Sequence, residues 1–471
     1  MSVRRFGAVS VALCVVGIAA NASAQSSTSV HGVGTFSLAY TDNMLGVSSD
    51  PEPGQPGPLD VWYLEIAPGL AVIHDGPRAM HTFTYLHPFT IYLGHSDANE
   101  QSDVGAWHAL FTLSPRDELT LGVTMERSNT RLANLQSGAD QTTAGSQLSG
   151  DNVLLQAAFT QGYSREFSAQ WSTFQSASFR TVVPLDVPAP QPNRYELGLG
   201  LAPEYSEGRN SYAVLGDATY FTTSEVNEGG VFAPSTAQVV MSGRFRWRHD
   251  LSLSWSTEVS GGFAGAMRVD PVSGGVWGPV GLGAIRYDSE GYAAALVAHR
   301  TLGPDLITAQ TLMADHILLS GGVPVDRENH IVFQTGTGFS HSRTLQVEDA
   351  GFVVAAPFAT PGSTGNQRLI TTFNTWVLDA SLGWYPEALP YVALRYQHLE
   401  QVGEDSQFAP ATTFHRNLAM LTVGMMWPSR EVPQVPQGPS QRVDGADRDD
   451  RILGGAREGG TRGPGGRPGG R

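Results

Sequence analysis

The sequence predicts an all-β fold, an antiparallel up-and-down barrel of about 18 strands, with an even count in the range 14 to 18. Three observations predict this fold. Amphipathic, strand-length segments fill most of the chain, the links between them alternate between long and short, and an export signal precedes them. Long loops at one rim and tight turns at the other are typical of a barrel that closes within a membrane.

The first residues have the three parts of a secretory signal peptide. Arg4-Arg5 gives a positive start, an apolar stretch runs from 9 to 18, and Ala22-Ser23-Ala24 forms a small-residue cleavage site. We therefore expect residues 1–24 to be cleaved. The single cysteine, Cys14, lies inside this signal, so the sequence predicts no disulfide and no Cys-based metal site.

The composition excludes some classes of protein. After residue 25 no run of 18 apolar residues occurs, so we expect no membrane-spanning helix. The formal net charge of −15 disfavours nucleic-acid binding, which depends on a basic surface that displaces counterions from phosphates. An apolar content of 41% suits a soluble β protein as well as a membrane barrel, so the residue pattern has to decide between them.

Eighteen segments alternate apolar and polar residues with a period of two, the spacing of a β-strand. Most exceed the roughly 5 to 6 residues of a strand in a soluble sheet and match the roughly 9 to 11 residues of a tilted membrane strand. The predicted strands lie near residues 31–43, 60–74, 79–93, 103–114, 117–130, 150–162, 165–180, 194–204, 211–223, 237–249, 251–266, 275–288, 291–301, 306–320, 329–343, 368–385, 391–403 and 413–428.

The two faces separate most clearly in the segment from 238 to 248. One face carries Val239, Met241, Gly243, Phe245 and Trp247. The other face carries Gln238, Val240, Ser242, Arg244, Arg246 and Arg248. An apolar face toward lipid and a polar face toward a watery lumen would produce this pattern.

The links between the segments provide a second test. Tight links rich in turn-forming residues are predicted at 75–78, 114–117, 162–166, 206–210, 249–250, 288–291 and 386–390. Longer polar links are predicted at 44–59, 131–149, 181–193, 224–236, 344–367 and 404–412. Two links break the alternation, because 302–305 is short where a long link is expected and 321–328 is longer than the other short links.

Aromatic residues gather near the short links, as in the girdles of membrane barrels. The predicted girdle consists of Tyr163, Tyr205, Tyr212, Trp247, Tyr287, Tyr292, Trp384, Tyr391 and Trp427. The alternative is that these rings cap the core of a soluble sheet. The membrane interpretation is favoured because the export signal agrees with it.

The predicted domains are the signal peptide (1–24), a barrel (25–428) and a tail (429–471). An even strand count places both ends of the barrel on one side, which we expect to be the periplasm. The tail is rich in Gly, Pro and Arg and has too few apolar residues for a core, so we expect it to be disordered. Its arginines suit contact with anionic cell-wall polymers, although a solvated linker without a partner is the favoured alternative.

The segment Thr422-Val423-Gly424-Met425-Met426-Trp427 resembles the closing strand of Gram-negative outer-membrane barrels, and residues 31–428 are similar in pattern to the porin class. The resemblance implies an outer-membrane location, contact with membrane lipid and lipopolysaccharide, and insertion by the barrel assembly machinery. It leaves open whether the chain forms a homo-oligomer. The third long link (131–149) lacks the acidic constriction of porins, since its charges are Arg131 and Asp140.

Charges on the predicted inner faces would line a pore and set its ion preference. The basic candidates are Arg244, Arg246, Arg248 and Arg395, and the acidic candidates are Glu118, Glu126, Glu196 and Glu258. The first three arginines would form a ladder along one strand, with steps of about 7 Å. They would either attract anions or pair with the glutamates across the lumen, and the sequence does not choose between these roles.

These observations favour a passive diffusion channel for small hydrophilic solutes, because a barrel of 16 to 18 strands leaves an aqueous interior. The alternative is a non-conducting structural or adhesive barrel that displays its long loops. An enzyme is disfavoured because no Gly-x-Ser-x-Gly elbow or phosphate loop occurs, and no cofactor or metal site is predicted.

Overall fold

The computed structural model describes most of the predicted barrel. The described residues are 26–44, 57–129, 153–186, 192–228, 231–233, 235–270, 272–289, 292–305, 310–326, 328, 330–345, 372–386, 390–404 and 413–427. The predicted signal peptide and tail lie outside them. Within these ranges no helix has the length and apolar character needed to cross a membrane.

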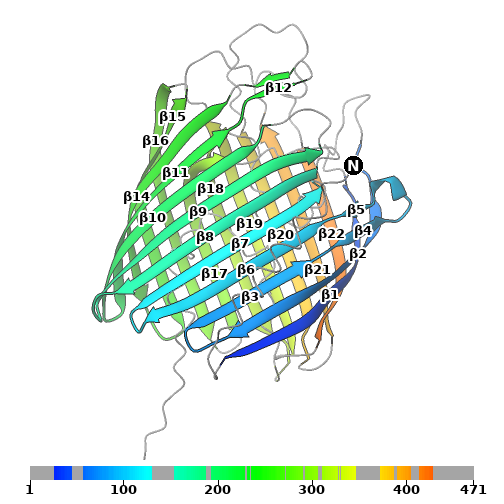
Figure 1. The fold of residues 1–471 in the computed structure, drawn as a ribbon, viewed down its shortest axis with the longest axis horizontal. Coiled ribbons are helices and arrows are strands. Elements are labelled where there is room, and N and C mark those ends of the chain that lie inside the picture. Colours follow the sequence, from blue (N-terminus) through cyan, green and yellow to red (C-terminus); the bar gives the residue numbers. More distant parts are fainter. Residues whose placement is uncertain are drawn as a thin grey trace, which may run out of the picture.

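The described strands form one closed wall (Figure 1). Their bounds are β1 Ser27–Thr41, β2 Val61–Asp75, β3 Ala79–Leu86, β4 Phe89–Tyr92, β5 Glu100–Gln101, β6 Asp103–Ser114, β7 Asp117–Asn129, β8 Val153–Glu166, β9 Trp171–Asp186, β10 Arg194–Glu207, β11 Asn210–Thr223, β14 Thr236–Asp250, β15 Trp255–Asp270, β16 Val272–Ser289, β17 Tyr292–Asp305, β18 Gln310–Pro324, β19 Ile331–Leu345, β20 Thr372–Trp384, β21 Tyr391–Glu404 and β22 Thr413–Trp427. A short helical turn (Ser96–Ala98) and a two-stranded ribbon (β12 Val226–Glu228, β13 Val231–Ala233) lie within the links.

Closure comes from the pairing of the first strand with the last. β1 is antiparallel to β2 on one side and to β22 on the other, so the wall has no free edge. The wall holds eighteen strands in its described part, when β3 with β4 and β5 with β6 are each counted as one. The predicted all-β class, antiparallel topology and strand number are therefore confirmed.

Proline explains why one predicted strand is split. The segment predicted at 79–93 is interrupted at His87 and Pro88, because proline has no N–H to donate to a ladder. The register continues across the gap, since Gly69 pairs with Leu86 and Ile66 pairs with Phe89. The interruption is local, and the wall remains closed there.

The links follow the predicted alternation with two corrections. Short links lie at 76–78, 115–116, 167–170, 208–209, 251–254, 290–291, 325–330 and 385–390, and we call this end the short-link rim. At the opposite rim, the strands predicted at 251–266 and 275–288 extend toward each other, so that position 271 alone separates β15 from β16. The predicted link at 302–305 is part of β17, and the break lies at 306–309.

The two faces of the wall have opposite chemistry, as the alternation in the sequence predicts. On β14, Phe245 is 54% exposed while the adjacent Arg246 is 4% exposed. On β10, Leu197 and Leu199 are exposed while Glu196 is buried. The large exposed apolar side chains mark the outer face, and the side chains that alternate with them point inward.

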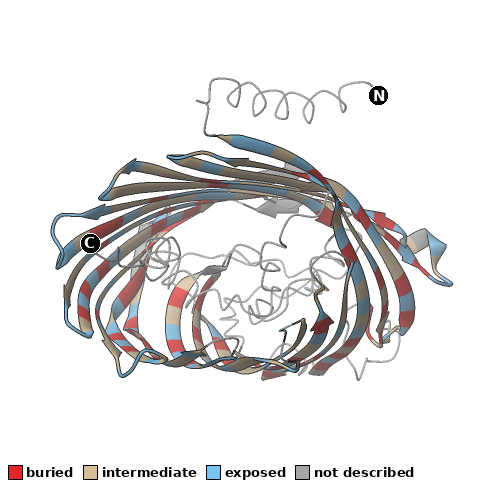
Figure 2. Cartoon of the chain, turned by 90° about the horizontal axis from the view of Figure 1, so that it is seen from below, coloured by how far each residue is buried: buried red, intermediate tan, exposed pale blue. Residues whose placement is uncertain are grey.

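The barrel is elongated in cross-section (Figure 2). Its wall bends between β14 and β18, because side chains of these two strands are in direct contact. Thr311 on β18 donates a hydrogen bond to Gln238 on β14 at 2.7 Å, although three strands lie between them along the wall. Small inward residues fill this corner, including Ala264 and Ala266, which pack with Val240. The corner is therefore a dry contact between strands that are not neighbours.

Gly262 permits this bend. A Cβ added to Gly262 would lie 2.0 Å from the carbonyl oxygen of Gly243 on the adjacent strand, whereas a Cβ on Gly261 would meet nothing within 4 Å. The contact involves backbone, which cannot rotate away as a side chain can. The bend therefore requires glycine at position 262 and tolerates a side chain at position 261.

We expect Gly262→Ala to lower the free energy of unfolding by about 1–3 kcal/mol through overpacking, and Gly261→Ala to change it far less. Urea titration in detergent, followed by the gel shift between boiled and unboiled protein, measures both variants. Equal stability of the two variants would contradict this account of the bend.

Candidate functional site

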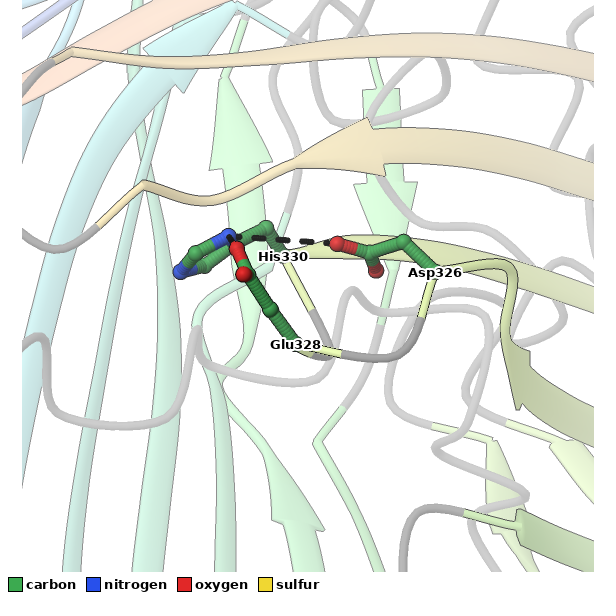
Figure 3. A group of neighbouring side chains, drawn as sticks. All are labelled: Asp326, Glu328 and His330. Atoms are coloured by element: carbon green, nitrogen blue, oxygen red, sulfur yellow. Dashed lines mark ion pairs between the residues drawn. The ribbon is translucent and has the colours of Figure 1, made fainter.

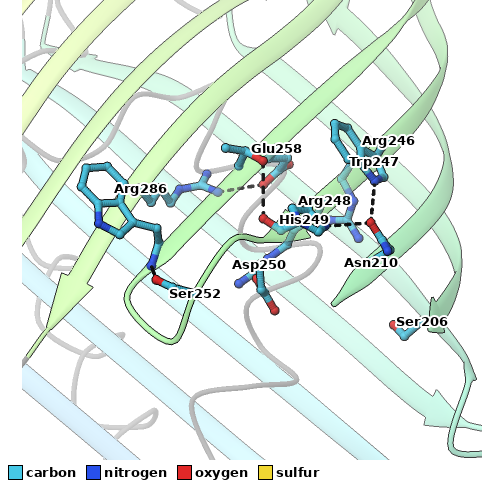
Figure 4. Close-up of polar contacts among 12 residues, drawn as sticks. Ser206, Asn210, Arg246, Trp247, Arg248, His249, Asp250, Ser252, Glu258 and Arg286 are labelled. Carbon is cyan, nitrogen blue, oxygen red and sulfur yellow. Dashed lines mark hydrogen bonds and ion pairs between the residues drawn. The ribbon is translucent and has the colours of Figure 1, made fainter. Parts of the chain in front are cut away.

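The predicted arginine ladder lies on the inner face of β14. Arg244 and Arg246 are buried or half-buried, and they alternate with the exposed Phe245 and Trp247. Arg248 continues the ladder toward the short-link rim (Figure 4). The inward face of this one strand therefore presents three guanidinium groups to the lumen.

Each ladder arginine has an acidic partner. Arg246 Nη2 lies 2.8 Å from Glu204 Oε2, and Arg244 Nη2 lies 3.3 Å from Asp217 Oδ1. Arg248 Nε lies 3.3 Å from Asp250 Oδ1 on the same strand. The acidic partners of the three ladder arginines are therefore residues of the same or nearby strands, and none of them is among the predicted glutamates.

A small residue makes the most buried of these pairs possible. Arg246 lies opposite Ala213 on β11, and Ala213 lies opposite Glu204 on β10. The methyl group of Ala213 leaves room for the guanidinium to pass over β11 and reach the carboxylate. Arg246 and Glu204 are 5% and 18% exposed, so water screens this pair weakly.

Two further ion pairs brace the wall. Arg286 Nη1 lies 2.7 Å from Glu258 Oε2, joining β16 to β15 (Figure 4). Arg395 Nε donates to both carboxylate oxygens of Asp379, at 3.2 and 3.0 Å, joining β21 to β20. Each of these pairs between strands runs along the wall between nearby strands. The predicted set of pore-lining residues does not include Asp217, Glu204 or Asp379. The alternation along their strands is the signal that could have placed them on the inner face, but their pairing depends on strand register.

The remaining predicted glutamates lie elsewhere on the inner face. Glu118 and Glu126 are on β7, which four strands separate from β14, so the structure does not bring them to the ladder. Glu126 Oε1 accepts a hydrogen bond from Ser128 Oγ at 2.7 Å. Glu196 is buried on the inner face of β10.

The predicted girdle residues occupy the outer face near the short-link rim, with one correction. Two of them pack in aromatic pairs, Tyr205 with Trp171 and Tyr287 with Trp255, at centroid distances of 5.0 and 4.9 Å. Tyr391 lies on the inner face instead. Its ring covers Gly424 on the paired strand, and a Cβ added to Gly424 would lie 2.3 Å from that ring. The outer-face positions are Tyr163, Tyr205, Tyr212, Trp247, Tyr287, Tyr292, Trp384 and Trp427.

One group of metal-ligating side chains lies in the link between β18 and β19, at Asp326, Glu328 and His330 (Figure 3). Their donor atoms lie within 4.8 Å of one another. His330 Nδ1 is 3.2 Å from Glu328 and 3.8 Å from Asp326, and Asp326 Oδ1 accepts the N–H of Ile331 at 2.7 Å. Asp326 therefore holds this turn through its hydrogen bond to the backbone, and His330 lies between the two carboxylates.

No protein-family model matches the chain, and no curated protein matches it. Among solved structures, the chain is similar to OccAB3 of Acinetobacter baumannii, with 10% identity, a TM-score of 0.43, and coverage of 84% of this chain and 99% of that one. It is similar to the outer membrane protein opdK of Pseudomonas aeruginosa, with 9% identity, a TM-score of 0.43 and coverage of 85% and 99%. The siderophore receptor PirA of A. baumannii matches with 7% identity, a TM-score of 0.42 and coverage of 85% and 81%. Identities of 7–10% and TM-scores of 0.42–0.43 do not indicate a function, so the proposed function rests on the chain's own residues.

The ladder allows a matched stability test. We expect Arg246→Met to lower the free energy of unfolding by about 3 kcal/mol, because it leaves the Glu204 carboxylate buried without its partner. Arg248→Met should cost less than about 1 kcal/mol, because Arg248 and Asp250 are 36% and 42% exposed. Urea titration in detergent compares the two variants, and adding Glu204→Gln to Arg246→Met should recover most of the loss.

Proposed function

We propose that the chain is an outer-membrane channel for passive diffusion of small hydrophilic solutes. The observation that carries this proposal is a closed eighteen-strand wall whose outer face is apolar and whose inner face holds charged pairs. A barrel of 16 to 18 strands is wide enough for an aqueous interior. Hydrated solutes would cross along the inner face, while the outer face contacts acyl chains.

The orientation and lipid contacts belong to the same proposal. We infer that the short-link rim and both ends of the barrel face the periplasm. Polar clusters interrupt the outer face toward the opposite rim, where His87 and Arg127 contact Asp103 at 2.7 and 3.5 Å, and Arg300 pairs with Asp315. This is the level at which phosphate-bearing headgroups of the outer leaflet, including lipopolysaccharide, would meet the wall.

The second candidate is a non-conducting surface barrel that displays its long links. It is favoured by the gathering of most long links at one rim, and the bilayer experiment below separates it from the channel. A catalytic role is not part of the proposal.

Reconstitution of the purified protein into planar bilayers tests the channel. We expect stepwise single-channel currents in potassium chloride, because ions should pass through the aqueous interior. Native protein that has been denatured by boiling serves as the negative preparation. A folded barrel that gives no current steps at any salt concentration would contradict the channel and favour the display role.

The balanced ladder predicts opposite selectivity shifts for two triple variants. Arg244→Glu, Arg246→Glu and Arg248→Glu together should move the zero-current potential in a salt gradient toward cation preference. Glu204→Gln, Asp217→Asn and Glu258→Gln together should move it toward anions, because they leave inner-face arginines without their acidic partners. An unchanged potential in both variants would remove the ladder from the selectivity of the pore.

A further inference from the structure

The line where β16 meets β17, which we call the seam, is paired over only part of its length. From the short-link rim the ladder runs as far as Gly281 opposite Arg300. Beyond this point β16 continues to pair with β15 as far as Val272, and β17 continues to pair with β18 as far as Asp305. Within the described part of the chain, the two strands therefore separate at Gly281 and follow different neighbours toward the opposite rim.

The end of the β17–β18 hairpin lies across the inner face of β14, β15 and β16. We call residues 301–305 and 310–314 the hairpin tip. Leu302 of the tip packs in a buried cluster with Ala264 of β15 and Val280 of β16. The hydrogen bond from β18 to β14 joins the same two surfaces. The tip is therefore held against the inside of the wall by apolar packing and by a polar contact.

The alternation of side chains shows how the tip is placed. On β17, Leu302 has the same parity as Leu296, which is exposed on the outer face. On β18, Met313 has the same parity as the exposed Ile317 and packs against the cluster of Leu302. A Cβ added to Gly278 on β16 would lie 2.7 Å from the end of the Met313 side chain, so glycine gives this side chain room. The outward side of the tip thus faces the inward side of the wall, as a second β-layer.

Two prolines explain why the seam does not continue. If the same register extended past its end, Pro279 of β16 and Pro304 of β17 would both lie on the seam. Pro279 pairs with Phe263 on its other side, and this pairing is uninterrupted. Pro304 likewise pairs with Thr311 on its other side. Because proline has no N–H, the side without a donor is the one toward the seam, and each strand lacks a ladder donor where the two would have to meet.

A single proline does not separate strands elsewhere in this wall. Pro203 on β10 pairs with Thr173 on β9, while the pairing of β10 with β11 skips Ala202 and Pro203. The ladder with β11 resumes at Glu204, so this interruption is local. The seam differs because a proline lies on each of its two strands.

We propose that the hairpin tip is the size-selecting constriction of the channel and that Pro279 and Pro304 keep it inside the lumen, an inference that rests on the proposed diffusion channel. Stacked β-sheets lie about 10 Å apart, so a second layer narrows the lumen by roughly that amount on this side. Thr301 and Gly303 have inner-face parity and lie on the lumen side of the tip, where both are half-buried. The position of the tip then sets the largest solute that passes.

Removal of the tip tests its role directly. Replacing residues 303–312 by Asn-Gly joins Leu302 to Met313, its register partner, through a two-residue hairpin turn. In planar bilayers this variant should conduct about twofold more than the native protein, because a sheet layer of about 10 Å leaves the lumen. It should also admit larger polyethylene glycols, which lower the current when they enter the pore. An unchanged conductance and polymer limit would overturn the constriction while leaving the channel in place.

Substitution of the prolines tests what keeps the tip inside. Pro279→Val with Pro304→Thr restores both donors, so the seam can pair further and the polymer limit should rise as it does when the tip is removed. The control is Pro203→Ala, which restores a donor where the strands stay paired beyond the proline, and it should leave the polymer limit unchanged. Equal limits in the double variant and the native protein would contradict the role of the prolines.

Cross-linking reports the position of the tip without a current. The only cysteine, Cys14, lies in the predicted signal peptide, so Gln238→Cys with Thr311→Cys supplies the thiols of the mature chain. A short bifunctional thiol reagent should join these positions, because their side chains are in contact at 2.7 Å, and the closed loop changes migration in a denaturing gel. A yield that falls in the double-proline variant and not in its control supports the held tip, even if no variant conducts and the proposed channel fails. An equal yield in all backgrounds would overturn it.

Discussion

Backbone hydrogen bonding is the constraint on which this structure depends. A wall that crosses a hydrocarbon layer has no water to satisfy its N–H and C=O groups, so each strand needs a partner on both sides. The pairing of β1 with β22 supplies the last of these partners and removes the sheet edge. Once the wall is closed, alternate side chains must point either to lipid or into the lumen, and the opposite chemistry of the two faces follows.

In the closed barrel, charged side chains of the inner face pair with one another. Arginines of the inner face meet acids on nearby strands, and small residues such as Ala213 give them room to do so. The described pairs run along the wall and do not cross the lumen. A polar wall whose arginines are paired with acids suits the proposed diffusion of hydrophilic solutes, because it favours hydrated molecules without holding one charge tightly.

The bend between β14 and β18 is a consequence of the same strand pairing. Glycine at 262 lets adjacent backbones approach, and the resulting corner brings Gln238 to Thr311.

The sequence by itself determined the strand number, the two faces and most of the girdle, because a period of two and the turn residues are local signals that each segment carries alone. It also placed Arg244, Arg246 and Arg248 on the inward face. The tertiary structure decided which inward residues meet, since register depends on pairing between segments such as those of Ser340 and Thr375. It also placed the Tyr391 ring over Gly424 and outside the girdle. Gly424 on the paired strand has no side chain, and this leaves space for the ring. The partners Glu204 and Asp217 became visible only when strand pairing brought them beside the ladder.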